Sequence, residues 1–211
     1  RRVSQEAYLP SVRHEPDSDR VDYVARLAAS WVKLARKSRA ERRVALVLSD
    51  YPARGGRTGY AVGLDTAASA REILRLLQAE GYDLGARAWS AADIEKFLVA
   101  PAEHVDISLA AYGAWAKALP PSLQRSLDET WDKPEKDFRL PVLRCGNVLV
   151  MLQPDRGSME DRKSGYHDTS CPPCHAYVAL YAWLRESQKI DALVHLGTHG
   201  TLEWLPGKAL A

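Results

Sequence analysis

Short apolar runs that lead directly into polar or glycine-rich loops constrain the fold of this chain more than any other feature. They lie at residues 44–48, 147–152 and 192–194. Uninterrupted runs of this length are typical of strands that are buried on both faces of a parallel sheet. Helical patterns separate them, the clearest of which covers residues 176–187. The sequence therefore predicts an α/β fold in which layers of parallel sheet are flanked by helices.

The last two runs and the helix between them predict a parallel crossover, with the strands at 147–152 and 192–194 as neighbours. The loops that follow these two strands should then emerge at the same edge of the sheet, where α/β proteins place their chemistry. Further helices are predicted from caps and breaks, with a short strand at 138–143. These helices cover residues 18–38, 65–80, 91–99, 107–119 and 122–131, and Leu76 is expected on the buried side of the second. The helix at 176–187 carries an apolar stripe that includes Tyr181.

The chain divides into three segments by composition. A lead-in and an N-terminal helix occupy residues 1–41, a first α/β segment with a glycine-rich loop occupies 42–132, and a second α/β segment follows the polar linker, at 133–211. The basic residues near the end of the first helix can bind an acidic partner, although solvated charges at the negative end of the helix dipole are the simpler interpretation.

Composition indicates an ordinary globular protein. The 211 residues carry a net charge of +2, so no overall field favours nucleic acid or a membrane surface. No apolar run approaches the ~20 residues of a membrane span, the start is not a signal peptide, and three cysteines are too few for a disulfide scaffold. A cytoplasmic protein is therefore predicted. Because the sequence starts at Arg1 without Met and stops soon after its richest motif, we expect a truncated piece of a larger multidomain subunit.

Two histidines and a glutamate follow the last apolar run. His195, His199 and Glu203 are spaced i, i+4, i+8, which on a helix would place them on one face. Gly197 and Gly200 lie between them, and helix interiors lose about 1 kcal/mol for each glycine. We therefore predict a loop, in which glycine lets the backbone approach a ligand closely. A structural loop whose histidines bond only to backbone is the alternative.

The segment HLGTHGTLEWLPGK at residues 195–208, called the motif segment below, resembles a signature of the CobN/magnesium chelatase H family. Three other blocks are also similar to this family: YPARGGRTGYAVGLDTAAS, GNVLVMLQPDRG and YHDTSCPPCHAYVALYAWLRES. Together they cover roughly residues 44–208. Cys171 and Cys174 depart from the family pattern around the two prolines.

The resemblance implies a fragment of the large, tetrapyrrole-binding subunit of an ATP-dependent cobaltochelatase. Such an enzyme is a ligase that inserts Co²⁺, its substrate, into hydrogenobyrinic acid a,c-diamide in cobalamin biosynthesis. ATP and Mg²⁺ would be used by two partners, an AAA+ ATPase subunit and a subunit with a metal-binding domain. No tightly bound cofactor is expected here, and the isolated fragment is expected to be inactive. Magnesium chelatase H, which inserts Mg²⁺ into protoporphyrin IX, is the alternative within the family.

Metal insertion suggests roles for individual residues. His195, His199 and Glu203 would bind the metal, and His199 and Glu203 would act in catalysis, because imidazole suits cobalt and a carboxylate accepts protons. The other candidates would contact the macrocycle. The cations Arg54, Arg57 and Lys208 would meet its peripheral acids, Trp204 or Tyr166 would stack on its face, and His167 and His175 would lie in the same cleft.

The CPPCH segment at residues 171–175 has several interpretations. A redox site, a haem attachment site and a zinc site with His167 and His175 all use Cys-x-x-Cys. We favour the simplest interpretation, that the prolines begin a helix and the thiols are incidental. The loop at 50–60 lacks the residues of either common phosphate-binding motif, so a nucleotide site there is disfavoured. A redox or protein-binding scaffold domain remains the alternative from another functional class.

Overall fold

The computed structural model describes residues 2–3, 12–13, 15–50, 59, 61–157, 168–198 and 205–206. It divides into two compact units, Arg1–Ser38 and Arg39–Ala211. In the first, β1 (Arg2–Val3) pairs antiparallel with β2 (Val12–Arg13), and α1 spans Ser18–Arg36. Asp17 caps α1, because its carboxylate accepts a hydrogen bond from the Arg20 N–H at 3.2 Å. No described helix has both the length and the hydropathy needed to cross a membrane.

The second unit is built on a five-stranded sheet of order β4-β5-β6-β3-β7. Its strands are β3 (Val44–Leu48), β4 (His104–Ile107), β5 (Phe138–Cys145), β6 (Val148–Leu152) and β7 (Ala192–Leu196). β3 runs parallel to both β6 and β7, which confirms the α/β class. β5 is antiparallel to β4 and β6. A tight connection between β5 and β6 permits only that direction, since parallel strands need a long crossover.

The position of β3 corrects one prediction. The strands at 147–152 and 192–194 were expected to be neighbours, but β3 lies between them and pairs with each. All five residues of β3 are buried. A strand without polar side chains on either face is most stable in the centre of a sheet, where both of its edges are paired and both of its faces are covered.

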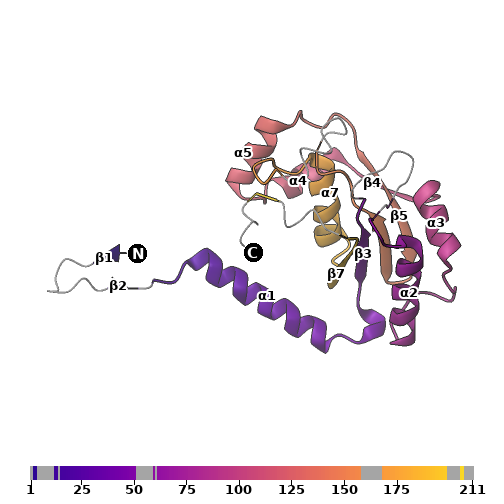
Figure 1. The fold of residues 1–211 in the computed structure, drawn as a ribbon. Coiled ribbons are helices and arrows are strands. Elements are labelled where there is room, and N and C mark those ends of the chain that lie inside the picture. The colour runs from indigo at the N-terminus through magenta and orange to yellow at the C-terminus, as the bar shows by residue number, and fades with distance from the viewer. Residues whose placement is uncertain are drawn as a thin grey trace. The chain divides into compact units, whose positions relative to one another are not determined.

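Helices cover both faces of the sheet (Figure 1). One face carries α2 (Thr66–Ala79) and α3 (Ala91–Val99). The other carries α4 (Leu109–Ala116), α5 (Pro121–Thr130) and α7 (His175–Ala182), which continues as a π-helical turn, η2 (Trp183–Ser187). A short 3₁₀ turn, η1 (Arg39–Glu41), precedes β3.

The side chains of β3 alternate between two hydrophobic clusters. Val44, Leu46 and Leu48 pack with α2 and α3. Ala45 and Val47 pack on the side of α4, α5 and α7. This period of two is the geometry of a strand, and it places an apolar core on each side of the sheet.

Two local predictions differ from the structure. A helix was predicted over residues 107–119, but β4 ends at Ile107 and α4 begins at Leu109. Val105 and Ile107 are buried while Asp106 between them is exposed, an alternation that suits a strand. Leu76, expected on the buried side of the second helix, is 49% exposed. The segments proposed at 42–132 and 133–211 both contribute strands to the same sheet.

Candidate functional site

The carboxyl ends of three parallel strands lie in register at one edge of the sheet. Leu48 of β3 pairs with Leu152 of β6 on one side and with Leu196 of β7 on the other. The Ser49 N–H donates to the Leu196 carbonyl at 2.9 Å, and the Gln153 N–H donates to the Leu48 carbonyl at 2.9 Å. The prediction that the loops after β6 and β7 emerge together is confirmed, and the loop after β3 joins them.

A partly buried polar network leads to His195 at this edge. His195 lies on β7, and its Nε2 is 2.8 Å from the Tyr181 hydroxyl of α7. The Gln153 amide donates to the hydroxyls of Tyr181, at 2.5 Å, and Tyr177, at 3.1 Å. Burial raises the pKa of Tyr181, so its hydroxyl keeps its proton at neutral pH. The structure thus places one nitrogen of the predicted metal ligand His195 against a tyrosine.

Arg156 ties the loop after β6 to the CPPCH segment. It is only 2% exposed, and its guanidinium donates to the carbonyls of Asp168 and Cys171 at 2.5 and 2.6 Å. In return, the Cys174 N–H donates to the Arg156 carbonyl at 2.7 Å. The arginine therefore acts as a structural clamp at the edge where the candidate site lies.

His175, the other predicted site histidine in the described part of the chain, belongs to a separate pair. It is the first residue of α7, and its Nδ1 is 2.6 Å from the Tyr112 hydroxyl. Burial lowers the pKa of His175, partly offset by the charge of Asp128. Burial also raises the pKa of Tyr112 to about 12. His175 and Tyr181 are six positions apart on one helix, a rise of about 9 Å, so the two histidine pairs are distinct.

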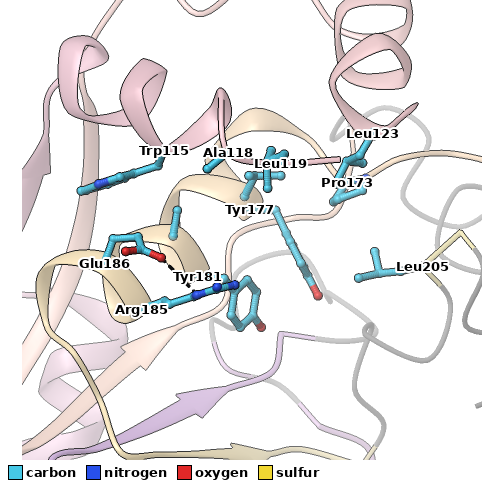
Figure 2. Close-up of a pocket in the computed structure, with 12 residues that line it drawn as sticks. Trp115, Ala118, Leu119, Leu123, Pro173, Tyr177, Tyr181, Arg185, Glu186 and Leu205 are labelled. Carbon is cyan, nitrogen blue, oxygen red and sulfur yellow. Dashed lines mark ion pairs between the residues drawn. The ribbon is translucent and has the colours of Figure 1, made fainter. Parts of the chain in front are cut away.

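A cavity of about 300 Å³ lies between α4, α5 and α7 (Figure 2). Tyr177 and Tyr181 line it, so the network that leads to His195 also borders this cavity. Leu205 of the motif segment lines it as well. Arg185 and Glu186 form an ion pair at 3.1 Å on its wall. The remaining lining residues are mostly apolar: Trp115, Ala118, Leu119, Leu123, Pro173, Val178 and Ala182.

The thiols of the CPPCH segment are poor candidates for redox chemistry. Burial raises the pKa of Cys171 and of Cys174, whereas a reactive thiol needs a lowered pKa. The Cys174 thiol also faces the Asp155 carbonyl at 3.1 Å. Among the described residues, no three His, Cys, Asp or Glu side chains form a group that could hold a metal ion. The two prolines lie just before Cys174, the N-cap residue of α7, whose side chain makes no capping hydrogen bond, so the prolines lead into the helix and do not themselves begin it.

Eight of the predicted site residues lie outside the described residues: Arg54, Arg57, Tyr166, His167, His199, Glu203, Trp204 and Lys208. Their roles stay predictions, as does the zinc interpretation, which needs His167.

Sequence reasoning missed three residues that the structure brings to this edge: Gln153, Arg156 and Ser49. The Ser49 hydroxyl is buried and has no hydrogen-bond partner in the part of the chain that the structure describes. Ser49 and Gln153 are the first polar residues after the apolar runs of β3 and β6, and that position is the signal that could have identified them.

The comparisons with known proteins agree with the signature segments. A family model described as CobN/Magnesium Chelatase matches residues 3–211. The chain is 41% identical over 216 residues to the aerobic cobaltochelatase subunit CobN of Sinorhizobium sp, covering 95% of this chain and 17% of that protein. It is 34% identical over 200 residues to the H-type magnesium-chelatase subunit of Rhodobacter capsulatus, covering 89% of this chain and 16% of that protein.

A solved structure, the catalytic subunit of cobaltochelatase from Mycobacterium tuberculosis, matches with a TM-score of 0.75 and 34% sequence identity. The match covers 93% of this chain and 18% of that chain. This chain therefore spans less than a fifth of the length of the relatives that it matches. With the family model matched over nearly its whole length, the chain belongs to the CobN/magnesium chelatase family.

Proposed function

We propose that this chain is part of the large, tetrapyrrole-binding subunit of a cobaltochelatase. The observation that carries the proposal is the difference in identity between the two branches of the family. Two CobN subunits are 41 and 42% identical to the chain, whereas two bacterial magnesium-chelatase H subunits are 29 and 34% identical. In this proposal the whole subunit inserts Co²⁺ into hydrogenobyrinic acid a,c-diamide, and ATP is hydrolysed by the AAA+ partner.

Metal insertion makes three chemical demands. Water must be stripped from Co²⁺, the ion must be held near the macrocycle, and the pyrrole N–H protons must be removed. We assign metal binding to His195, His199 and Glu203, and proton acceptance to Glu203 with His199. The position of His195 at the shared edge of β3, β6 and β7 supports this assignment, because ligands of open α/β sheets bind beyond the carboxyl ends of the strands.

The macrocycle itself would be held by the remaining candidates. Arg54, Arg57 and Lys208 would pair with its peripheral carboxylates. Trp204 or Tyr166 would stack on the ring, and His167 and His175 would lie beside it. The register of β3 and β6 favours a common site, since the loop with the arginines follows β3 and the loop with Tyr166 and His167 follows β6.

The decisive experiment is Glu203→Gln in the whole subunit, assayed with its ATPase and metal-binding partners. The amide keeps the shape of the side chain but cannot accept a proton at neutral pH, so insertion should fall at least 100-fold while macrocycle affinity stays nearly constant. Glu129→Gln, the same change on the exposed surface of α5, is the matched control and should be neutral. Unchanged chelation by the Glu203 variant would reject the assignment.

Magnesium chelatase H is the second candidate, and the 34% identity to the Rhodobacter protein is the observation in its favour. Parallel assays separate the two, with Co²⁺ and the corrin substrate in one and Mg²⁺ and protoporphyrin IX in the other. A titration of each macrocycle followed by absorption tests the remaining alternative, a redox or protein-binding scaffold. A scaffold would leave both absorption spectra unchanged.

A further inference from the structure

We propose that Tyr181 is a positioning residue that holds the His195 imidazole at the carboxyl edge of the sheet, and that Gln153 holds Tyr181 in turn. The catalytic consequence of this arrangement rests on the proposed function. The contact between Tyr181 and His195 does not rest on the proposed function, because it can be measured without any assay of chelation.

The three side chains come from three elements that meet at one place. Gln153 directly follows β6, Tyr181 lies on α7, and His195 lies on β7. The Gln153 amide nitrogen is 2.5 Å from the Tyr181 hydroxyl, which is 2.8 Å from His195 Nε2. The network therefore connects β6 to β7 through a side chain of α7, and it contains no side chain of β3, the strand between them.

The ring contacts restrict Tyr181 as well. Its ring centroid lies 5.0 Å from that of Tyr177 and 5.9 Å from that of His195. With the ring held between these neighbours and the hydroxyl bonded to Gln153, the oxygen has a fixed position. An imidazole otherwise rotates broadly about χ2, so a bond at Nε2 to a fixed oxygen selects one ring orientation.

Packing alone does not account for this arrangement. Gln153 is 5% exposed, and a buried amide destabilises a fold unless its hydrogen bonds are made. Tyr177 belongs to the same network, because its hydroxyl accepts a hydrogen bond from the same amide at 3.1 Å. The matched control for Tyr181 is therefore Tyr82, whose hydroxyl accepts a hydrogen bond from Arg42 at 3.1 Å and which packs against the cluster on the other face of the sheet.

The direct test is chemical labelling of His195 with diethyl pyrocarbonate in the whole protein, followed by peptide mass spectrometry. Tyr181→Phe removes the bond to Nε2, so the labelling rate of His195 should rise about fivefold, the effect of losing one net hydrogen bond. Tyr82→Phe should leave the rate unchanged, and His104 on β4 provides an internal reference. Equal His195 rates in the Tyr181 variant and the unsubstituted protein would overturn the proposal.

A second variant covers the case in which Tyr181→Phe does not fold. Gln153→Met removes the amide that holds Tyr181 while keeping the length of the side chain, and it should also raise the labelling of His195. If the labelling rate is unchanged in this variant, Gln153 does not hold Tyr181 and that half of the proposal fails. Thermal unfolding of each variant verifies that the comparison is made between folded proteins.

The catalytic consequence is tested by the split between kcat and KM. In the chelatase assay Tyr181→Phe should lower kcat by about tenfold or more with KM for the macrocycle unchanged, as for other residues that orient a metal ligand. Tyr82→Phe should change neither constant. If labelling of His195 becomes faster while kcat is unchanged, the contact between Tyr181 and His195 is supported but the assigned role of His195 in metal insertion is contradicted. If the labelling rate is unchanged, the positioning of His195 by Tyr181 is refuted, whatever the kinetic constants.

Discussion

Gly146, in the turn between β5 and β6, has the most restricted environment of the described glycines. Its φ is +55°, and a Cβ built on it would lie 2.6 Å from both the Asp83 carbonyl oxygen and the Gly85 nitrogen. Both atoms belong to backbone and cannot rotate away. The hairpin that aligns β6 with β3 thus depends on the absence of a side chain at this residue.

Gly146→Ala should accordingly destabilise the protein by about 2–4 kcal/mol, since strain at positive φ adds to the clash. Urea unfolding measures the change. Gly113, inside α4, is the control because no atom lies within 4 Å of its added Cβ. Gly113→Ala should stabilise the protein by up to about 1 kcal/mol through helix propensity. A neutral Gly146 substitution would show that the turn can rearrange.

At the scale of secondary-structure elements, the loop after β6 is held against the start of α7 by backbone contacts around Arg156. The guanidinium reaches the carbonyls of Asp168 and Cys171, and the Arg156 carbonyl receives the Cys174 N–H. Gly157 is the next residue, and a Cβ added to it would lie 3.3 Å from the Trp131 ring. The N-terminal end of α7, with His175, is positioned by this clamp.

Arg156→Met should release the segment that the clamp holds. Two partly buried carbonyls lose charged donors, a loss of about 2–4 kcal/mol, and the amide protons at 168–178 should exchange faster. Hydrogen exchange with mass spectrometry measures both the size and the location of the effect. Arg139→Met, at an exposed residue whose ion pair with Asp106 spans 3.6 Å, should change neither. Equal protection in the two variants would contradict the role of the clamp.

At the scale of the whole molecule, the sheet unit is a three-layer sandwich with one hydrophobic cluster on each side of β3 (Figure 1). His175 and Tyr112 adjoin the cluster beneath α4, α5 and α7. Because this layer holds a histidine that burial keeps neutral, its protonation is linked to the stability of the entire unit.

Stability should therefore depend on pH through His175. Its pKa in the folded state is lowered, so below about pH 6.5 the unfolded chain binds more protons than the native protein. The contribution of His175 to the free energy of unfolding should be at its maximum above that pH and should decrease as the pH falls toward the folded-state pKa. His175→Gln should show a flatter profile between pH 5 and 7, measured by thermal melts in matched buffers. A profile with the same slope as that of the unsubstituted protein would refute the linkage.

The sequence alone determined the elements whose signals are local. The apolar runs predicted β3, β6 and β7, and groups of candidate cap residues predicted the starts of three helices, where the structure identifies Asp17, Asp65 and Ser90 as the N-caps. These signals involve residues within about one turn of each other, so they can be read along the chain. The motif segment predicted the family in the same way, because its residues are contiguous.

The tertiary structure alone decided which strands are neighbours and which side chains meet. Residues 104–107 became a strand because β5 pairs with them, and β3 entered between β6 and β7 although about 100 residues separate it from β6. In the sequence Tyr181 is one position of an apolar helical stripe, whereas in the structure its hydroxyl contacts His195 of a different element, β7. Pairing order and side-chain contact depend on the burial of surfaces that are distant in sequence, and no local pattern encodes that free energy.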